Sequence, residues 1–478
     1  MSPSTAGQRI VFDITTVCRS QGHATGIVRV EREFAKWALQ NLRNAVFVFF
    51  DPEAQCYRRV KEEWIERLFR GEIVIDARSL PRAQTERRHI LDRLPRRFRR
   101  GSKWILQLRR KLLMSLELVR LKTQNPTVAG RVERIQKSIM SEKYRQWLFQ
   151  PDGTRRPFLE VDTILGVPHE FLPTDILVCV GLVWDQVNLQ PIAEARRRNG
   201  LRIVLLCHDI IPLQLPHLCV PSNVDAFRDW FYRVVPVCDL IITATHQVEK
   251  DVLEYCAEHN LPVKKTAVTA FGADGARGGG GRDTVVRLGL EPGRYILFVS
   301  TIDPRKGHRF LLRVWKQLLK AGIPQRENTK LVLAGRIGWM VDDLVVELKQ
   351  LGAKTGSLML LPDINDDALG ALYESAAFCV FPSEYEGFGL PLIEAFQHGK
   401  AVIASTGGAV PEVVGDFSPC LDPHDEAAWT EMLGSWIADA DLRRPYEVAI
   451  RARFRHPTWE EASKQFFETV VSNSSRPQ

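Results

Sequence analysis

The sequence has 478 residues, of which 45% are hydrophobic, 26% charged and 9% aromatic. These values predict two or three globular domains, and they exclude a single small binding module, a disordered chain, a collagen-like chain and a coiled coil. The formal net charge is +8, yet residues 81–140 alone contain 17 Lys and Arg against 4 Asp and Glu. Because the positive charge is confined to one segment, we do not expect a nucleic acid as a partner.

Short apolar runs alternate with longer, helix-compatible segments in both halves of the chain. This alternation is typical of α/β domains with parallel sheets. The predicted strands are residues 10–12, 46–50, 176–180, 203–207 and 240–243 in the first half, and 295–299, 331–334, 358–361, 378–381 and 401–404 in the second. We therefore predict two doubly wound domains, at residues 1–275 and 293–456.

The basic segment is predicted to be a helical insertion in the first domain, at about residues 80–150. From Trp104 to Leu118 apolar residues recur at near-helical spacing, and Arg109, Arg110 and Lys111 lie among them. This pattern predicts a basic amphipathic helix. Such a helix can lie on an anionic membrane or pack against its own domain, and the sequence leaves both open.

The segment Gly272 to Arg294 contains four consecutive glycines and no periodic apolar pattern. We interpret it as the connection between the domains, with the linker at residues 276–292. A phosphate-binding loop at Gly278 to Gly281 is the alternative. The Lys-Ser/Thr pair that completes such a loop is missing, which disfavours it.

No segment approaches the roughly 18–20 apolar residues that span a bilayer, and the N-terminus has no apolar signal-peptide core. We therefore expect a cytoplasmic protein. The nine cysteines include no C-x-x-C pair, and several lie in or beside apolar runs. We expect reduced thiols, with neither a disulfide nor a zinc site.

The most informative motif is FPSEYEGFGLPLIEAF, residues 381–396. A predicted strand ends at Phe381, a glycine-rich turn follows, and Pro391 stands where the first turn of a helix favours proline. The backbone amides of Gly387, Phe388 and Gly389, with Leu390 after them, then lie at the positive end of a helix dipole. This arrangement predicts an anionic ligand at the carboxyl end of the strand.

Two glutamates flank this turn with seven residues between them. Glu386 is expected in the loop and Glu394 inside the helix, so they face one ligand from different heights. This separation suits hydrogen bonds to two polyhydroxyl parts of an extended ligand better than it suits a shared proton. A capping Glu386 with a solvated Glu394 is the structural alternative.

With this E-x7-E pair, the segment EGFGLPLIEAF resembles glycosyltransferase family 4, whose members are retaining enzymes of the GT-B fold. The resemblance implies two Rossmann-like domains that face a central cleft, with the nucleotide-sugar donor held mainly by the C-terminal domain. It covers about residues 10–470, except the basic insertion. It also implies that residues 457–478 form a helix that crosses back to the N-terminal domain.

The segment VSTIDPRKGHRF strengthens the resemblance. Lys306 matches the basic residue that these enzymes direct at the donor diphosphate, and Arg305 stands beside it. Many members carry an arginine six positions before the lysine, where this chain has Ser300. The sequence leaves open whether Arg305 supplies the second positive charge.

Three further segments match a subset of the same family. In CHDIIP the resemblance implies that His208 faces the donor sugar, with Asp209 orienting the loop. In ATGIVRV it places Gly26 near a phosphate, although an ordinary loop glycine fits equally well. In LAGRIGW it adds Arg336 to the donor-binding residues.

The resemblance thus implies a retaining glycosyltransferase, with mannose from GDP-mannose as the expected donor. We expect an α linkage to a lipid-linked oligosaccharide or a polysaccharide, as in exopolysaccharide or lipopolysaccharide assembly. Glu386, His208 and Lys306 are the predicted catalytic residues. Neither a cofactor nor a metal is expected, because no Asp-x-Asp motif stands near a strand end.

Three alternatives remain open. The donor can be a UDP- or dTDP-sugar, or the protein can be a hydrolysing sugar-nucleotide epimerase of the same fold. The third is a basic scaffold that binds RNA or membrane and keeps a vestigial transferase fold. If the basic segment, residues 81–140, contacts an anionic membrane, the enzyme would be peripheral at the inner face of the cytoplasmic membrane.

Overall fold

A computed structural model describes most of the chain. The described residues are 8–20, 26–75, 112–113, 115–116, 119–120, 123, 125–140, 158–182, 184, 189–274, 281–362 and 364–473. The chain divides into two compact units, residues 4–203 (the first unit) and residues 204–478 (the second unit). The division falls inside one of the predicted strands, and the predicted domain boundaries remain predictions.

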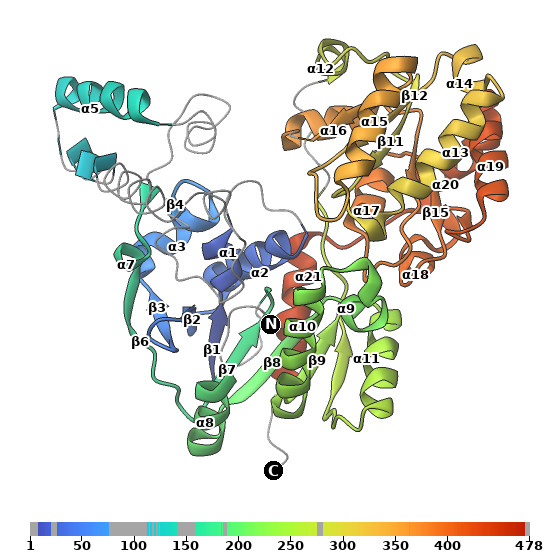
Figure 1. Cartoon of the computed structure of the whole chain (residues 1–478). Helices are drawn as coiled ribbons and strands as arrows, with labels where there is room; N and C mark the ends of the chain where they lie inside the picture. The colour runs from blue at the N-terminus through green and yellow to red at the C-terminus, as the bar shows by residue number, and fades with distance from the viewer. Residues whose placement is uncertain are drawn as a thin grey trace, which may run out of the picture. The chain divides into compact units, whose positions relative to one another are not determined.

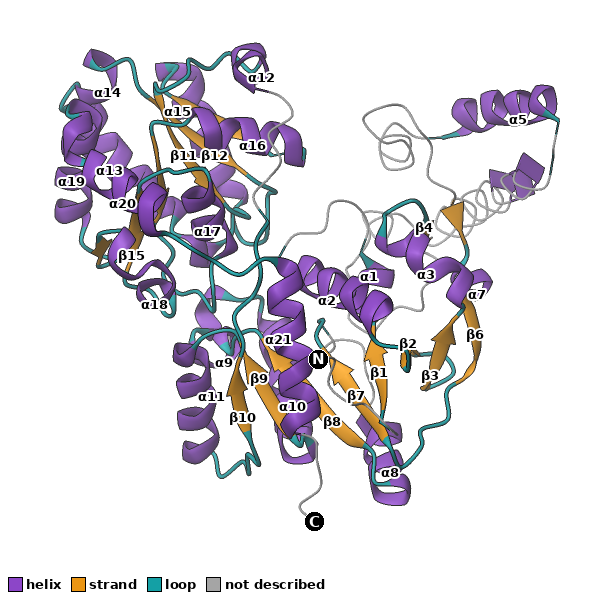
Figure 2. Ribbon diagram, turned by 180° about the vertical axis from the view of Figure 1, so that it is seen from behind, coloured by secondary structure: helices purple, strands orange, loops and turns teal. Residues whose placement is uncertain are grey.

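The first unit contains a mixed sheet (Figures 1 and 2). Its strands lie in the order β7-β1-β2-β3-β6, in which β7, β1 and β2 are parallel and β3 and β6 are antiparallel additions. The strands are β1 (Arg9–Asp13), β2 (Ala45–Asp51), β3 (Cys56–Val60), β6 (Leu165–Pro168) and β7 (Asp175–Cys179), and β4 (Val74–Ile75) pairs separately with β5 (Phe158–Leu159). The helices are α1 (Thr15–Arg19), α2 (Ile27–Asn41), α3 (Glu62–Phe69), α5 (Pro126–Ile139), α7 (Val161–Ile164) and α8 (Leu189–Asn199).

The second unit begins with three parallel strands and their helices. These are β8 (Arg202–Cys207), β9 (Leu240–Thr243), β10 (Thr266–Val268), α9 (Ile211–Gln214), α10 (Pro221–Val234) and α11 (His246–Glu258). β8 and β9 are buried along most of their length, which explains why they are almost continuously apolar, whereas the residues of β10 are only partly buried.

A second parallel sheet follows, in the order β13-β12-β11-β14-β15-β16. Its strands are β11 (Tyr295–Val299), β12 (Lys330–Ala334), β13 (Leu358–Leu361), β14 (Phe378–Phe381), β15 (Val402–Ser405) and β16 (Cys420–Leu421). Helices lie on both sides of this sheet (Figures 1 and 2). They include α12 (Gly281–Arg287), α13 (His308–Lys320), α15 (Asp342–Thr355), α16 (Asp366–Ser375), α17 (Leu390–Gln397), α18 (Val410–Val414), α19 (Glu426–Ala438) and α20 (Arg444–Arg453). The last helix, α21 (Trp459–Asn473), lies beside α10 instead (Figures 1 and 2).

Each of the ten predicted runs forms a strand, and no predicted end differs from the observed end by more than one residue. The antiparallel strands β3 and β6 were not predicted. They are short and carry charged or glycine residues (CYRRV and LGVP), so neither shows the apolar run on which the prediction relied. The prediction of parallel α/β sheets in two domains is confirmed.

The predicted linker contains a helix that the sequence analysis did not anticipate. Although the segment from Gly272 to Arg294 shows no periodic apolar pattern, α12 lies within it, and the segment's role as the connection between domains stays a prediction. Val285 and Leu290 are buried in the hydrophobic core built around β11 and β14. Two isolated apolar residues make no periodic pattern in the sequence, so the helix was not predicted. Residues 275–280, with most of the glycine run, lie outside the described residues.

The predicted insertion contains a helix, α5, whose Asn125 side chain accepts hydrogen bonds from the first-turn N–H groups. Gln136 on α5 donates to the carbonyl of Leu113 at 3.3 Å. The amphipathic helix predicted from Trp104 to Leu118 lies mostly outside the described residues. No helix in the described ranges is long and apolar enough to cross a membrane.

Candidate functional site

Two loops meet at the carboxyl edge of the second sheet. β11 and β14 are parallel neighbours, and the loops that follow them contain Lys306 and Glu386. The Glu384 N–H donates to the Arg305 carbonyl at 2.8 Å. Gly307 has φ of 76°, and a Cβ there would lie 2.1 Å from the Pro382 carbonyl oxygen. Only glycine allows this backbone approach, so the sequence itself brings the two loops together.

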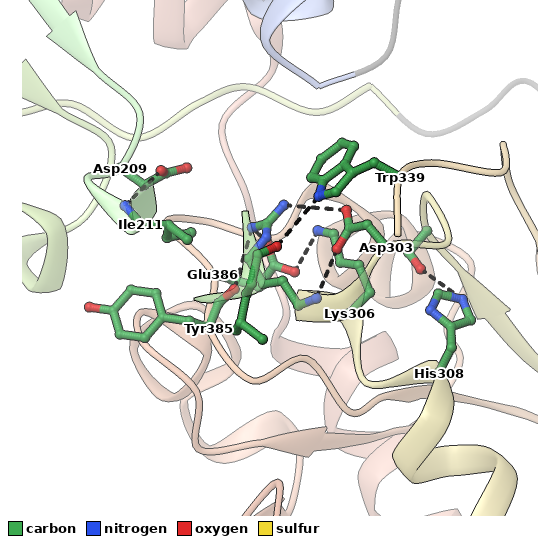
Figure 3. A network of polar contacts seen from close by, with 11 residues as sticks. Asp209, Ile211, Asp303, Lys306, His308, Trp339, Tyr385 and Glu386 are labelled. Carbon is green, nitrogen blue, oxygen red and sulfur yellow. Dashed lines mark hydrogen bonds and ion pairs between the residues drawn. The ribbon is translucent and has the colours of Figure 1, made fainter. Parts of the chain in front are cut away.

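Glu386 lies between two cations (Figure 3). Lys306 Nζ is 2.5 Å from Glu386 Oε1, and Arg305 Nη1 is 3.2 Å from Glu386 Oε2. The Glu386 residue is only 5% exposed. The structure therefore joins three of the predicted site residues in one cluster, in which Lys306 and Arg305 are the two cations that contact the buried Glu386.

The pKa directions agree with this arrangement. Burial raises the pKa of Glu386, but the charges of Lys306 and Arg305 outweigh burial, so the pKa lies below its usual value. Burial lowers the pKa of Arg305, and the neighbouring carboxylates, led by Glu386, raise it well above the usual value. Glu386 and Arg305 are therefore both charged at neutral pH.

Asp303 is a member of the cluster that the sequence analysis missed. Its Oδ1 accepts the Arg305 N–H at 3.0 Å, and its Oδ2 lies 3.9 Å from the Arg305 guanidinium. Burial raises its pKa above the usual value, despite the nearby cations. The Asp-Pro pair before Arg305 is the available signal, because aspartate before proline commonly starts a turn.

The loop after β8 meets the glycine turn of the glutamate motif. A Cβ on Gly387 would lie 2.3 Å from the His208 carbonyl oxygen, so glycine is required for the contact. The His208 ring lies against Phe271, with centroids 5.6 Å apart, and Phe271 lies 5.0 Å from Phe388. Thus His208, from one predicted motif, and Gly387 and Phe388, from another, are brought together within the second unit.

Asp209 fixes the loop that carries His208. Its Oδ1 accepts the Ile211 N–H at 3.1 Å at the start of α9 (Figure 3). Its negative charge also helps to raise the pKa of Arg305. The predicted orienting contact is therefore present.

The helix predicted after the glycine turn is α17. Gly389 precedes it with φ of 100°, Leu390 opens it, and Pro391 stands in its first turn. Glu394 is buried in this helix, where its Oε2 accepts the Tyr373 hydroxyl at 3.1 Å. The two glutamates thus differ in setting, one between cations and one beside a tyrosine.

Comparison with known proteins relates one part of the chain to a family. Residues 286–453, which contain most of this cluster, match the family described as glycosyl transferases group 1. In fold, the chain is similar to HepE of Anabaena, solved with UDP and glucose, over 97% of this chain and 100% of that one, with a TM-score of 0.55 and 15% identity. The chain has the GT-B fold, and residues 286–453 form a group 1 glycosyltransferase domain. Membership of family 4 remains a prediction.

Two relatives from Escherichia coli are named mannosyltransferases. O-antigen chain mannosyltransferase B is 35% identical over 171 residues, which are 36% of this chain and 44% of that protein. The serotype-specific mannosyltransferase WbdA is 28% identical over 325 residues, which are 64% of this chain and 38% of that protein. The chain therefore spans less than half the length of these relatives.

The remaining predicted residues lie outside the cluster around Glu386. Arg336 is exposed on the loop after β12 of the glycosyltransferase domain, and its carbonyl accepts the Ile302 N–H at 2.8 Å. Gly26 lies in the first unit at the start of α2, with φ of 55°. A Cβ on Gly26 would meet nothing within 4 Å, so backbone conformation is the reason for glycine there.

Ser300 stands where many family members have an arginine. Its Oγ lies 3.4 Å from Nε2 of the buried His308, at the start of α13. Burial, with a smaller effect of the Lys306 charge, lowers the pKa of His308 to about 3. The imidazole is therefore neutral at pH 7 and adds no positive charge beside Lys306. Within the described residues, no group of three His, Cys, Asp or Glu side chains is arranged to hold a metal ion.

Proposed function

We propose that this protein is a retaining mannosyltransferase that uses GDP-mannose and forms an α linkage to a lipid-linked or polysaccharide acceptor. The observation that carries the proposal is Glu386, buried between Lys306 and Arg305 at the carboxyl edge of the sheet. The named activities of the two relatives support the choice of mannose.

In this proposal the donor diphosphate binds Lys306 and Arg305. Both cations contact Glu386, and a diphosphate would compete with that carboxylate for them. When the bond between the anomeric carbon and the diphosphate oxygen breaks, negative charge develops on the leaving group. Fixed cations in a buried site stabilise that charge without reorganisation.

The other groups hold the sugar and the nucleotide. Glu386 and the amides of Gly387 to Gly389 would bind the sugar, and His208 would face it from the loop after β8. Glu394 would bind the ribose. The acceptor hydroxyl oxygen then attacks the anomeric carbon, and its proton leaves with the diphosphate. Charge compensation falls to side chains, so neither a cofactor nor a metal is part of the proposal.

A ligand panel tests the donor. Purified protein is heated with GDP, GDP-mannose, UDP-glucose or a dTDP-sugar, and a ligand at 100 times its Kd adds about 2.7 kcal/mol of apparent stability. Selective stabilisation by GDP and GDP-mannose is expected. Stabilisation by UDP or dTDP compounds would contradict GDP-mannose as the donor and indicate a UDP- or dTDP-sugar. No response to any nucleotide would favour a basic scaffold with a vestigial transferase fold.

A transfer assay tests the reaction. Labelled mannose should pass from GDP-mannose to a lipid-linked mannan primer, and GDP release should depend on the primer. Release of GDP at the same rate without primer would contradict transfer and favour a hydrolysing epimerase. The anomeric configuration of the product, read from its NMR coupling constants, separates retention from inversion.

We also propose that residues 81–140 contact an anionic membrane at the cytoplasmic face. The supporting observation is on α5, where Val128 and Ile135 are 39% and 48% exposed. Arg131 and Arg134 are exposed on the same helix. Apolar and basic side chains side by side suit the interface between headgroups and acyl chains.

Flotation with vesicles tests the membrane proposal. The protein should float with phosphatidylglycerol vesicles and remain in solution with phosphatidylcholine vesicles. Arg131→Glu with Arg134→Glu should weaken flotation. Equal flotation of the variant and the parent protein, or none with anionic vesicles, would overturn the proposal.

A further inference from the structure

The residue before Glu386 is tied to α11. Tyr385 donates its hydroxyl to Oδ2 of Asp251, which is only 5% exposed. Oδ1 of the same carboxylate accepts Gln247 Nε2 at 2.8 Å. Burial, together with the hydrogen bond to Asp251, raises the pKa of Tyr385, so the phenol keeps the proton that it donates. Because both oxygens of this buried carboxylate accept hydrogen bonds, breaking the bond to Tyr385 would be costly, and the Tyr385 side chain is held in place.

The residue after Glu386 is tied to the start of the same helix. Thr245, the residue before α11, donates its hydroxyl to the Gly387 carbonyl at 3.0 Å. The same hydroxyl oxygen accepts the Val248 N–H at 3.3 Å and so caps the helix. The backbone on both sides of Glu386 is therefore held by the first two turns of α11.

A third tie reaches α11 from α18. The Ala409 N–H donates to the Glu386 carbonyl at 2.9 Å, just before α18 begins. From α18, Glu412 accepts the N–H groups of His246 and Gln247 at 2.8 and 2.9 Å. A carboxylate at a helix N-terminus is favoured by the unpaired N–H groups and by the helix dipole. Glu386 is therefore held through the residue before it, the residue after it and its own carbonyl group.

We propose that Tyr385 and Asp251 are positioning residues that act through Glu386 and hold its carboxylate between Lys306 and Arg305. This inference rests on the proposed transferase function of the same site. Both cations are within 3.2 Å of the carboxylate, so a small backbone shift at residue 386 would break at least one contact. A shift of about 1 Å at a reacting group can reduce the rate about 100-fold.

The test compares variants of the pair. Tyr385→Phe removes the donor, Asp251→Ala removes the acceptor, and Asp251→Asn keeps one carbonyl oxygen for the phenol. We expect kcat to fall about 10- to 100-fold in the first two and to recover largely in the third. Because Tyr385 and Asp251 form one bond, the double variant Tyr385→Phe/Asp251→Ala should be no slower than the worse single variant.

The binding of GDP provides the readout that a merely structural role would not give. GDP lacks the sugar that Glu386 would bind, so its Kd should change less than about threefold while kcat falls. Tyr232→Phe is the matched control, because it also removes a phenol hydroxyl, 3.5 Å from that of Tyr255, far from the glutamate loop in sequence. The control should keep the parent kcat.

A kcat of Tyr385→Phe equal to that of the parent protein would overturn the proposal. Effects of the two substitutions on kcat that add in the double variant would also overturn it. So would a variant in which GDP affinity and Tm fall together with kcat, because that would indicate a general loss of structure. Hydrogen exchange without any ligand separates this proposal from the proposed function. If the parent protein neither transfers sugar nor binds GDP, the proposed function fails. Faster exchange at residues 382–390 in Tyr385→Phe, but not in Tyr232→Phe, would still support the tie, and unchanged exchange would reject it.

Discussion

Removal of the positive charge of Lys306 should slow the reaction far more than it destabilises the fold. We consider Lys306→Met, which keeps most of the side-chain length and loses the ammonium group. Loss of one fixed group that stabilises developing charge lowers kcat by about 10²- to 10³-fold. The same change should weaken binding of the nucleoside diphosphate, because the diphosphate loses one of its two cations.

The structural cost is limited by Arg305. Removing the partner of a buried charge costs about 3–5 kcal/mol when nothing replaces it. Here Arg305 Nη1 stays 3.2 Å from Glu386. We therefore expect a loss of only about 1–2 kcal/mol, because one partner remains. For a unit of this size that corresponds to a fall in Tm of about 2–8 °C.

The assay measures kcat with labelled GDP-mannose and a primer, and Tm by differential scanning calorimetry. Lys316→Met is the matched control, because Lys316 on α13 pairs with Glu347 in an exposed ion pair. An exposed pair contributes at most about 1 kcal/mol, and this one lies outside the cluster. A Lys306→Met enzyme with kcat within about threefold of the control would refute the charge-stabilising role.

Three further predictions follow from named contacts. Gly387→Ala should lower both Tm and kcat, since its Cβ would lie 2.3 Å from the His208 carbonyl oxygen. Burial lowers the pKa of His308 to about 3. Between that value and about pH 6.5 the imidazole is protonated in the unfolded chain but neutral in the folded chain, so the protein loses stability as the pH falls below about 6.5. His308→Leu should remove about 2 kcal/mol of the loss between pH 6.5 and 4.5, measured by urea unfolding. Burial raises the pKa of Asp175, but hydrogen bonds, including two from Arg9 at 2.7 Å, lower it to about 2. The ionised carboxylate should therefore add about 2 kcal/mol to the free energy of unfolding above pH 4, and this contribution should be lost toward pH 2. Asp175→Asn should lack it at every pH.

Each of these has an outcome that contradicts it. A Gly387→Ala protein with the Tm and kcat of the parent would show that the two loops separate freely. Parallel pH–stability curves for the parent and His308→Leu would mean that the imidazole titrates normally in the fold. For Asp175→Asn, the stability deficit at pH 7 should vanish near pH 2, and a deficit that stays constant would exclude the linkage.

The sequence by itself determined most of the strands, and it named candidate site residues that the structure brings together. The strands of the second sheet are buried runs such as YILFV and FCVF, whose composition alone indicates their structure. The strand that ends at Phe381 and the glycine turn after it indicated Glu386, whereas Lys306 was named from the resemblance to glycosyltransferase family 4. The helix after the glycine turn was equally clear, because Pro391 and the preceding glycine mark its start.

Tertiary structure decided what depends on contacts between distant residues. Nothing in the sequence indicated that Arg305 contacts Glu386, and the tertiary structure places Arg305 Nη1 3.2 Å from Glu386 Oε2. Whether Arg305 supplies the second positive charge at the donor diphosphate stays a prediction. Asp251 gave no signal, because it is one acidic residue on a helix and its partner, Tyr385, is 134 positions away. The helix α12 was missed because its burial depends on a core formed by strands that follow it. Local patterns specify an element and the end of a strand, whereas the partner of a buried charge is fixed only when separate elements pack together.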